Sequence, residues 1–234
     1  MEGDTKEYEA ELVLGLATNT WDTTGEIVAT ADASHLTGGV VAETLPHFLG
    51  QITQEPPMFS AIKVKGQKLV DLARQGVEIV RERRAVVIHR LKMTGWREDG
   101  TRRCATLLIS CSKGTYVRSL CRDIGARLGI AACMGKLMRT ASGPFELAES
   151  VTLEEFRSCP ERHIETIEAF LLPFPRVMLD ATDGARFVCG QRISMADLPE
   201  GEFAVFSDSR CVGIGLNKHN ILIPTRVLSR EENP

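Results

Sequence analysis

The feature that most constrains the fold is a pair of extended segments followed directly by an amphipathic helix. Residues 77–96 and 105–111 are rich in β-branched side chains, and the polar segment between them predicts a turn. In residues 116–128 the apolar side chains recur at intervals of three and four, which predicts a helix with one buried face. We expect Thr115 to cap the start of this helix and Gly129 to end it.

The rest of the first 175 residues predicts further strands and short helices. Residues 8–16 alternate between apolar and polar side chains, which indicates a half-buried strand. Residues 152–171 form an acidic stretch with a helical pattern. The other predicted elements are strands at 26–31 and 133–140, an extended segment at 58–64, and helices at 39–50 and 69–74.

A break in composition at residues 173–175, Pro-Phe-Pro, predicts a domain boundary. Beyond it the pattern changes to short strands at residues 203–207, 211–216 and 221–226. We therefore expect a first domain at 1–175 and a small β-rich domain at 176–234.

Composition excludes several classes of protein. Apolar residues make up 43% and charged residues 25%, which is ordinary for a globular chain, and no apolar run is long enough to span a bilayer. We expect a soluble, cytoplasmic protein that is not exported. The seven cysteines include no Cys-x-x-Cys pair and are expected to be reduced thiols, and the five histidines are too scattered to form a metal site. We expect no bound metal.

Charge is distributed unevenly along the chain. Residues 60–139 carry 18 Lys and Arg against 6 Asp and Glu, whereas the remaining residues are strongly acidic. A segment with a net charge of +12 fits the recognition of phosphate groups in a nucleic acid. A solvated basic face is the alternative interpretation.

The stretch SCSKGTYVRSLCRDIG, residues 110–125, predicts a strand that passes through a turn into a helix. Backbone N–H groups at the start of that helix, next to Lys113, would form an anion site. Tyr116 and Arg118 are two residues apart and diverge by about 200° around the helix, so both cannot face the core. The alternative is a capped helix with the tyrosine packed and the arginine in solvent.

Three blocks of sequence resemble one family. They are KEYEAELVLGLATNTWDTTGE, PPMFSAIKVKGQKLVDLARQG and CSKGTYVRSLCRDIG, and in this order they resemble the bacterial tRNA pseudouridine-55 synthases of the TruB family. The resemblance covers residues 2–175. The tail, with DGARFVCGQRIS and VFSDSRCVGIGLN, is similar to a small RNA-binding module of the PUA type.

The resemblance implies both a fold and an activity. The fold is α/β (α+β), with a mixed, mainly antiparallel sheet and flanking helices, followed by the PUA-like β-rich domain. The activity is the isomerisation of uridine 55 in the T-loop of tRNA to pseudouridine, without a metal or an organic cofactor. The target uridine must be flipped out of its loop. The implied partner is the T-arm of tRNA, and a complete family member is expected to be monomeric.

The resemblance also assigns roles to individual residues. Tyr8 would pack on the flipped base, Tyr116 would line the pocket, and Leu137 would form its floor. Arg118 would pair with a nucleophilic aspartate and hold it ionised. The residues expected to contact RNA are Lys63, Lys65, Lys113, Gly114, Thr115 and Arg139.

One part of the family pattern is missing from the sequence. The family's nucleophile belongs to a G-T-L-D-P block upstream of the strand that carries Tyr8, and no Asp-Pro pair occurs in this sequence. From their places in the pattern, neither Asp22 nor Asp123 is expected to substitute for it. We therefore expect an N-terminally truncated chain that is inactive alone, in which Arg118 turns to another acid, to water or to a bound anion. The alternative function is a non-catalytic protein that binds the tRNA T-arm or acts as an RNA chaperone, and an unrelated basic RNA-binding domain is a remote third interpretation.

Overall fold

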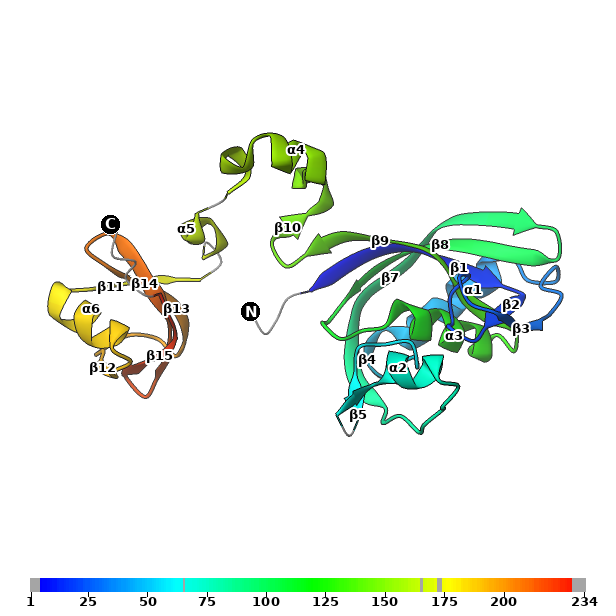
Figure 1. Cartoon of the computed structure of the whole chain (residues 1–234), viewed down its shortest axis with the longest axis horizontal. Helices are drawn as coiled ribbons and strands as arrows, with labels where there is room; N and C mark the ends of the chain where they lie inside the picture. Colours follow the sequence, from blue (N-terminus) through cyan, green and yellow to red (C-terminus); the bar gives the residue numbers. More distant parts are fainter. Residues whose placement is uncertain (1–4, 65, 165, 172–173, 229–234) are drawn as a thin grey trace. The chain divides into compact units, whose positions relative to one another are not determined.

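The computed structural model describes residues 5–64, 66–164, 166–171 and 174–228. The chain divides into two compact units, Met1–Ser150 and Val151–Pro234 (Figure 1). The expected domain boundary after residue 175 falls inside the second of these units and remains a prediction. Among the described residues, no helix has the length and apolar character needed to cross a membrane.

The first unit is built on a six-stranded sheet in which every neighbouring pair of strands is antiparallel. The strand order across the sheet is β10 (Phe145–Glu146), β9 (Ala132–Ser142), β1 (Lys6–Leu14), β8 (Arg102–Cys111), β7 (Arg84–Asp99) and β4 (Gly50–Gln54). Two small hairpins pair β2 (Leu16–Thr18) with β3 (Ile27–Thr30) and β5 (Lys63–Val64) with β6 (Gln67–Lys68). The helical segments are α1 (Gly38–Thr44), η1 (Leu45–Phe48), α2 (Leu69–Arg74), α3 (Val117–Arg127) and η2 (Leu147–Glu149).

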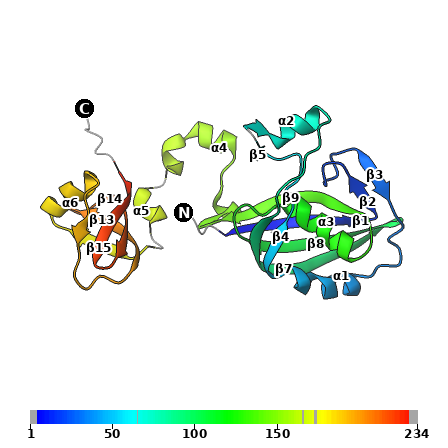
Figure 2. The ribbon, with the colours of Figure 1, turned by 90° about the horizontal axis from the view of Figure 1, so that it is seen from below.

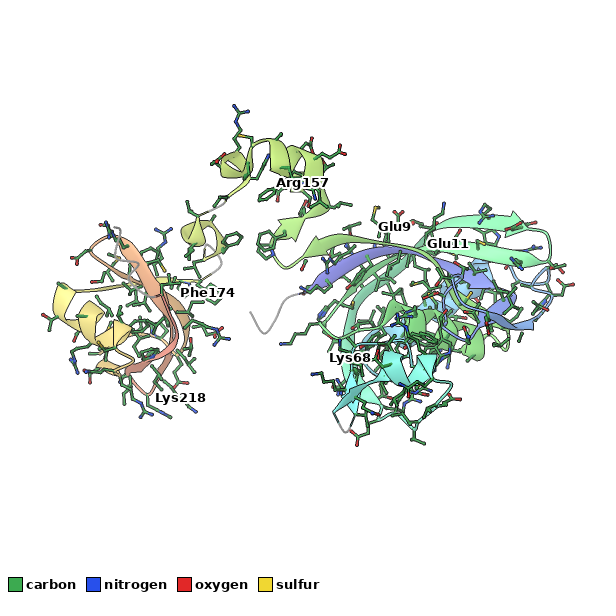
Figure 3. All side chains as sticks on the ribbon, viewed as in Figure 1. Glu9, Glu11, Lys68, Arg157, Phe174 and Lys218 are labelled. Carbon is green, nitrogen blue, oxygen red and sulfur yellow. The ribbon has the colours of Figure 1, made fainter. Side chains whose placement is uncertain are left out.

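The two faces of the large sheet differ in chemistry because side chains alternate along β1. Ala10 and Leu12 are buried in one core cluster with Leu120 of α3, whose ribbon lies against the sheet (Figure 2). Glu9 and Glu11 point away from α3 (Figure 3). This face carries ion pairs between strands, and in one of them Glu11 pairs with Arg97 of β7 at 3.0 Å. One face of the sheet is therefore apolar and covered by α3, and the other carries charged side chains.

The ends of α3 are determined by two different mechanisms. Gly129 lies at φ 71° and ends the helix, as expected, while the N–H of Ile130 donates to the carbonyl of Gly125 at 2.9 Å. The expected cap by Thr115 is wrong, because its hydroxyl donates to the carbonyl of Ser112 instead. The helix begins one residue later than predicted, after Tyr116. Its first turn is held from another element, as described below.

The second unit has a five-stranded sheet that α6 (Ala181–Val188) contacts. The strand order is β11 (Arg176–Leu179), β13 (Gly201–Ser207), β14 (Arg210–Lys218), β15 (Ile221–Val227) and β12 (Ile193–Ser194), and only β11 and β13 are parallel. Phe187 of α6 is fully buried in its core. The preceding segments are α4 (Leu153–Ser158), η3 (Pro160–His163) and α5 (Ile167–Phe170). The expected mixed, mainly antiparallel α/β (α+β) architecture with a β-rich second part is confirmed.

Three predicted elements differ from the structure. Residues 77–83 are not part of a strand, because β4 ends opposite Arg84 and offers no partner beyond it. The helix predicted at 39–50 ends early and passes into a 3-10 turn and then into β4. The helix predicted at 152–171 is divided into three short segments, since Pro160 cannot continue α4.

Candidate functional site

The centre of the candidate site is an ion pair between Arg118 of α3 and Asp22, which lies in the loop after β2. The Arg118 Nη1 is 3.2 Å from Asp22 Oδ2, and the two side chains are only 22% and 15% exposed. The guanidinium also donates to the carbonyl of Thr20 at 3.3 Å and to that of Phe59 at 2.8 Å. Arg118 thus turns to another acid, which was one of the outcomes expected from the sequence.

The loop around Asp22 stabilises the ionised form of its carboxylate. The hydroxyl groups of Thr20 and Thr24 and the backbone N–H of Thr24 all donate to Asp22 Oδ1, at 2.8, 2.5 and 3.1 Å. Burial raises the pKa of Asp22, but these hydrogen bonds and the charge of Arg118 outweigh it and lower the pKa below its ordinary value. Asp22 is therefore a charged anchor with both oxygens engaged.

The start of α3 is fastened to the end of β4. The side-chain Oε1 of Gln54 accepts the N–H of Tyr116 at 3.0 Å, and the hydroxyl of Ser119 donates to the carbonyl of Glu55 at 2.8 Å. Gln54 is almost fully buried, and its Nε2 has no hydrogen-bond partner among the described atoms. A side chain 62 residues upstream thus supplies the cap that no residue of the helix provides.

The turn before α3 carries three of the residues expected to bind an anion. Lys113 and Gly114 are exposed, and Gly114 adopts φ 81°, a conformation that glycine tolerates without strain. The N–H of Thr115 donates to Ser112 and that of Tyr116 to Gln54, so these two donors are already engaged. Their expected contact with RNA remains a prediction and depends chiefly on the Lys113 ammonium group.

Tyr8, Leu137 and Arg139 come together where β1 pairs with β9. Tyr8 lies opposite Arg139 and Ala10 lies opposite Leu137, so these four side chains share one face of the sheet. Tyr8 packs against the core that includes α3, whereas Leu137 is 45% exposed. Burial, together with nearby Cys111, raises the pKa of the Tyr8 hydroxyl, and Arg139 offsets this only in part. Tyr8 therefore stays protonated at neutral pH.

Lys63, in the basic segment of residues 60–139, lines two depressions in the protein surface. It lines a cavity of about 280 Å³ together with Leu69 and Arg84, and a second, more open groove of about 520 Å³ together with Lys68, which is labelled in Figure 3. Lys65, another predicted RNA contact, lies outside the described residues.

In the described part of the chain, the side chains that commonly bind metal ions lie apart from one another. Within the described ranges, no group of three or more His, Cys, Asp or Glu side chains could hold a metal ion. None of the seven cysteines, all of which lie in the described ranges, forms a disulfide, and four of them are buried. Burial raises the pKa of Cys133 to about 11, so this thiol is protonated and unreactive at neutral pH.

The sequence pattern placed Asp22 in a loop but did not identify it as the partner of Arg118. The expected partners were another acid, water or a bound anion. The signal that could have found it is the run Thr20–Trp21–Asp22–Thr23–Thr24, in which hydroxyl side chains surround one carboxylate. That pattern predicts a carboxylate fixed by local hydrogen bonds, but it does not name the distant arginine.

Comparisons with known proteins identify the family to which the sequence is similar. Residues 1–117 match the model of the TruB family pseudouridylate synthase N-terminal domain, residues 118–178 match the tRNA pseudouridylate synthase B C-terminal domain, and residues 175–228 match the C-terminal part of pseudouridine synthase II TruB. The tRNA pseudouridine synthase B of Symbiobacterium thermophilum is 48% identical over 80% of this chain, and that of Bacillus pumilus is 38% identical over 97% of this chain and 79% of its own length. The chain spans 62% of the length of the relatives from Symbiobacterium thermophilum and Pelotomaculum thermopropionicum.

Solved structures are similar in fold. A Cbf5–Nop10–Gar1 complex contains a chain that superposes with a TM-score of 0.60 at 21% identity, covering 96% of this chain and 66% of that one. An H/ACA ribonucleoprotein bound to a substrate RNA that contains 2′-deoxyuridine gives a TM-score of 0.63 at 19% identity, covering 98% and 68% of the two chains. At these identities the likeness describes the fold.

Proposed function

Because the chain belongs to the TruB family of pseudouridylate synthases, we propose that it serves the isomerisation of uridine to pseudouridine at position 55 of the tRNA T-loop. The observation that carries the proposal is the partly buried Arg118–Asp22 pair at the start of α3, next to Tyr116 of the GTYVR motif. Five hydrogen bonds with loop atoms hold this charged pair in place, and a partly buried pair of this kind is typical of a functional site.

The proposed roles follow from the chemistry of each side chain. Tyr8 presents an aromatic face and a protonated hydroxyl to a flipped uracil, so it can stack and exchange a proton at carbon 5. Leu137, exposed on β9, supplies an apolar surface under the base. We assign Tyr116, at the start of α3, to the wall of the pocket that would receive this base. Arg118 holds its carboxylate partner ionised.

Asp22 is proposed as the anchor of Arg118 and not as the attacking nucleophile. Its Oδ1 accepts three hydrogen bonds and its Oδ2 faces the guanidinium. A carboxylate that is stabilised in this way is a weak nucleophile, because its charge is already compensated. The family's G-T-L-D-P motif does not occur in this sequence, so we expect no turnover from these 234 residues alone.

The proposed partner is the T-arm of tRNA, bound by the segment with a net charge of +12 in residues 60–139, and the proposed location is the cytoplasm, where tRNA is modified. We further propose that the complete enzyme acts as a monomer and needs no metal or organic cofactor. The structural neighbour bound to a substrate RNA supports the RNA class of this partner.

Binding is tested with a T-arm hairpin over a range of salt concentrations. We expect affinity to fall steeply as salt rises, and Lys63→Ala or Lys113→Ala to reduce the slope of log K against log salt by about one for each phosphate that the variant no longer neutralises. The control is Arg157→Ala on α4, an exposed cation outside the basic segment, which should leave the slope unchanged. Affinity that does not depend on salt would remove the basic segment from the interface.

Turnover is tested by tritium release from tRNA labelled at carbon 5 of uridine. The chain alone should release none, and a fusion that adds the family's G-T-L-D-P block upstream of the strand with Tyr8 should release tritium unless its aspartate is changed to asparagine. A second candidate function, a non-catalytic T-arm binding protein or RNA chaperone, needs only the basic segment of residues 60–139. A fusion that binds the hairpin tightly and still releases no tritium would support this second function.

A further inference from the structure

Trp21, the residue before Asp22, has an unusual backbone. It adopts φ 62°, in the left-handed region that bulky side chains rarely occupy. Its backbone is fastened on both sides, because its N–H donates to the carbonyl of Thr18 at 3.2 Å and its carbonyl accepts the N–H of Met134 at 3.0 Å. Strain of this kind persists only where surrounding contacts enforce it.

Two arginines supply such contacts to the indole ring. The guanidinium carbon of Arg122 lies 3.8 Å from the ring centroid of Trp21, and that of Arg81 lies 5.4 Å from it. Both distances fall within the range of cation–π attraction, and tryptophan is its strongest aromatic partner. Arg81 is only 9% exposed, so its charge is poorly hydrated and is stabilised by the ring.

Glu55 joins these two arginines into one cluster. One of its oxygens pairs with Arg81, and the other lies 3.6 Å from Arg122 Nη1. Arg122 also donates from Nε and Nη2 to Asp123, at 2.9 and 2.7 Å. Two carboxylates therefore hold the guanidinium of Arg122 in the position where it contacts the indole ring.

The cluster and the Arg118–Asp22 pair involve adjacent residues of the loop and successive turns of α3. Arg118 and Arg122 are four residues apart on α3, so they lie on the same face of the helix one turn apart. Arg118 binds Asp22, and Arg122 contacts the residue before it, Trp21. Two successive loop residues are thus held by two successive turns of one helix.

We propose that Trp21 and Arg122 are positioning residues that hold Asp22 against Arg118. The ring contact opposes relaxation of the left-handed backbone at Trp21, and that backbone sets the direction of the next side chain. Glu55 and Arg81 support the contact from the side of β4. The importance of this device for catalysis rests on the proposed function, but the positioning itself can be measured in the free chain.

The test follows the carboxyl group of Asp22 by carbon-13 NMR during a pH titration of the full chain without RNA. Trp21→Ala or Arg122→Met should move the titration midpoint of Asp22 upward, because its carboxylate loses the guanidinium, and should change the side-chain nitrogen signals of Arg118. Trp21→Phe and Arg122→Lys keep a ring and a cation, so they should retain most of the wild-type behaviour. Glu55→Gln, which leaves the loop itself untouched, should give a smaller upward shift.

The matched control is Arg176→Met, which removes a similar contact in the second unit, where the guanidinium carbon lies 5.0 Å from the ring of Phe206. It should leave the titration of Asp22 unchanged. A wild-type midpoint and wild-type Arg118 signals in folded Trp21→Ala and Arg122→Met would overturn the proposal, and so would an equal shift in all four Trp21 and Arg122 variants. If either of the stronger variants fails to fold, an unshifted midpoint in Glu55→Gln overturns it. Failure of the wild-type chain to bind the T-arm would instead count against the proposed function.

Discussion

One arginine–aspartate pair from each unit, Arg118–Asp22 and Arg186–Asp183, can be compared, and the two pairs differ in burial and in separation along the chain. Arg118 and Asp22 are 96 residues apart in sequence, and their side chains are 22% and 15% exposed. Arg186 and Asp183 lie within α6, three residues apart, and are 49% and 31% exposed. The local pair is the shorter, at 2.8 Å against 3.2 Å. The Arg118–Asp22 pair links distant parts of the chain and is partly buried, so it contributes to the tertiary structure although its N···O distance is the longer of the two.

The helices that carry these pairs begin in equally different ways. Asp180 caps α6 from the adjacent position, because its side chain accepts the N–H of Asp183 at 2.8 Å. In α3 the corresponding acceptor is Gln54 of β4. One helix is capped by its adjacent residue, whereas the other is capped by a residue of the sheet.

The largest expected effect tests whether the units fold separately. Leu120→Ala in α3 and Phe187→Ala in α6 each remove a fully buried side chain and should cost about 2–5 and 3–5 kcal/mol. We expect each substitution to lower the urea midpoint of its own unit only, as followed by assigned amide signals. A common shift of both sets of signals would show one cooperative transition and would weaken the comparison.

An intermediate effect tests the difference between the two ion pairs. Arg118→Met should destabilise the first unit by about 1–3 kcal/mol, because it leaves the carboxylate of Asp22 partly buried without a cation. Arg186→Met should change the stability of the second unit by less than about 0.5 kcal/mol, since that pair is exposed. Equal losses in urea unfolding would mean that the burial of the Arg118 pair has no energetic consequence.

The smallest effect concerns pH. Hydrogen bonds and Arg118 lower the folded-state pKa of Asp22, so its contribution to stability is complete above the unfolded pKa of about 3.9 and is lost as pH falls through the folded value. Asp22→Asn should therefore be less stable than the wild type at pH 6, and the difference should shrink as pH falls below about 4. Thermal unfolding across this range measures it. A difference that is constant with pH would show that the charge of Asp22 is unimportant.

Much of the fold follows from local patterns. Alternation predicted β1, helical periodicity predicted α3, and Gly129 predicted where that helix ends. The short strands β13, β14 and β15 were also expected near their observed bounds. Helix α6 was not predicted, because its interior residue Gly184 has an unfavourable helix propensity. The structure requires a glycine at this position, since a larger side chain would approach Ser207 too closely.

The contacts that make the site could not be predicted in this way. Periodicity predicts that Arg118 points away from the core, but not that it binds Asp22. Composition predicts a basic segment, but it does not distinguish Arg122, which contacts the ring of Trp21, from Lys113, which is exposed. Gln54 lies in none of the predicted elements, and its role as the cap of α3 follows only from the tertiary structure. The physical reason is that helix and strand patterns depend on neighbours within a few residues, whereas these contacts join residues about 60 to 100 positions apart. They exist only after the sheet has brought β4, α3 and the loop of Asp22 together.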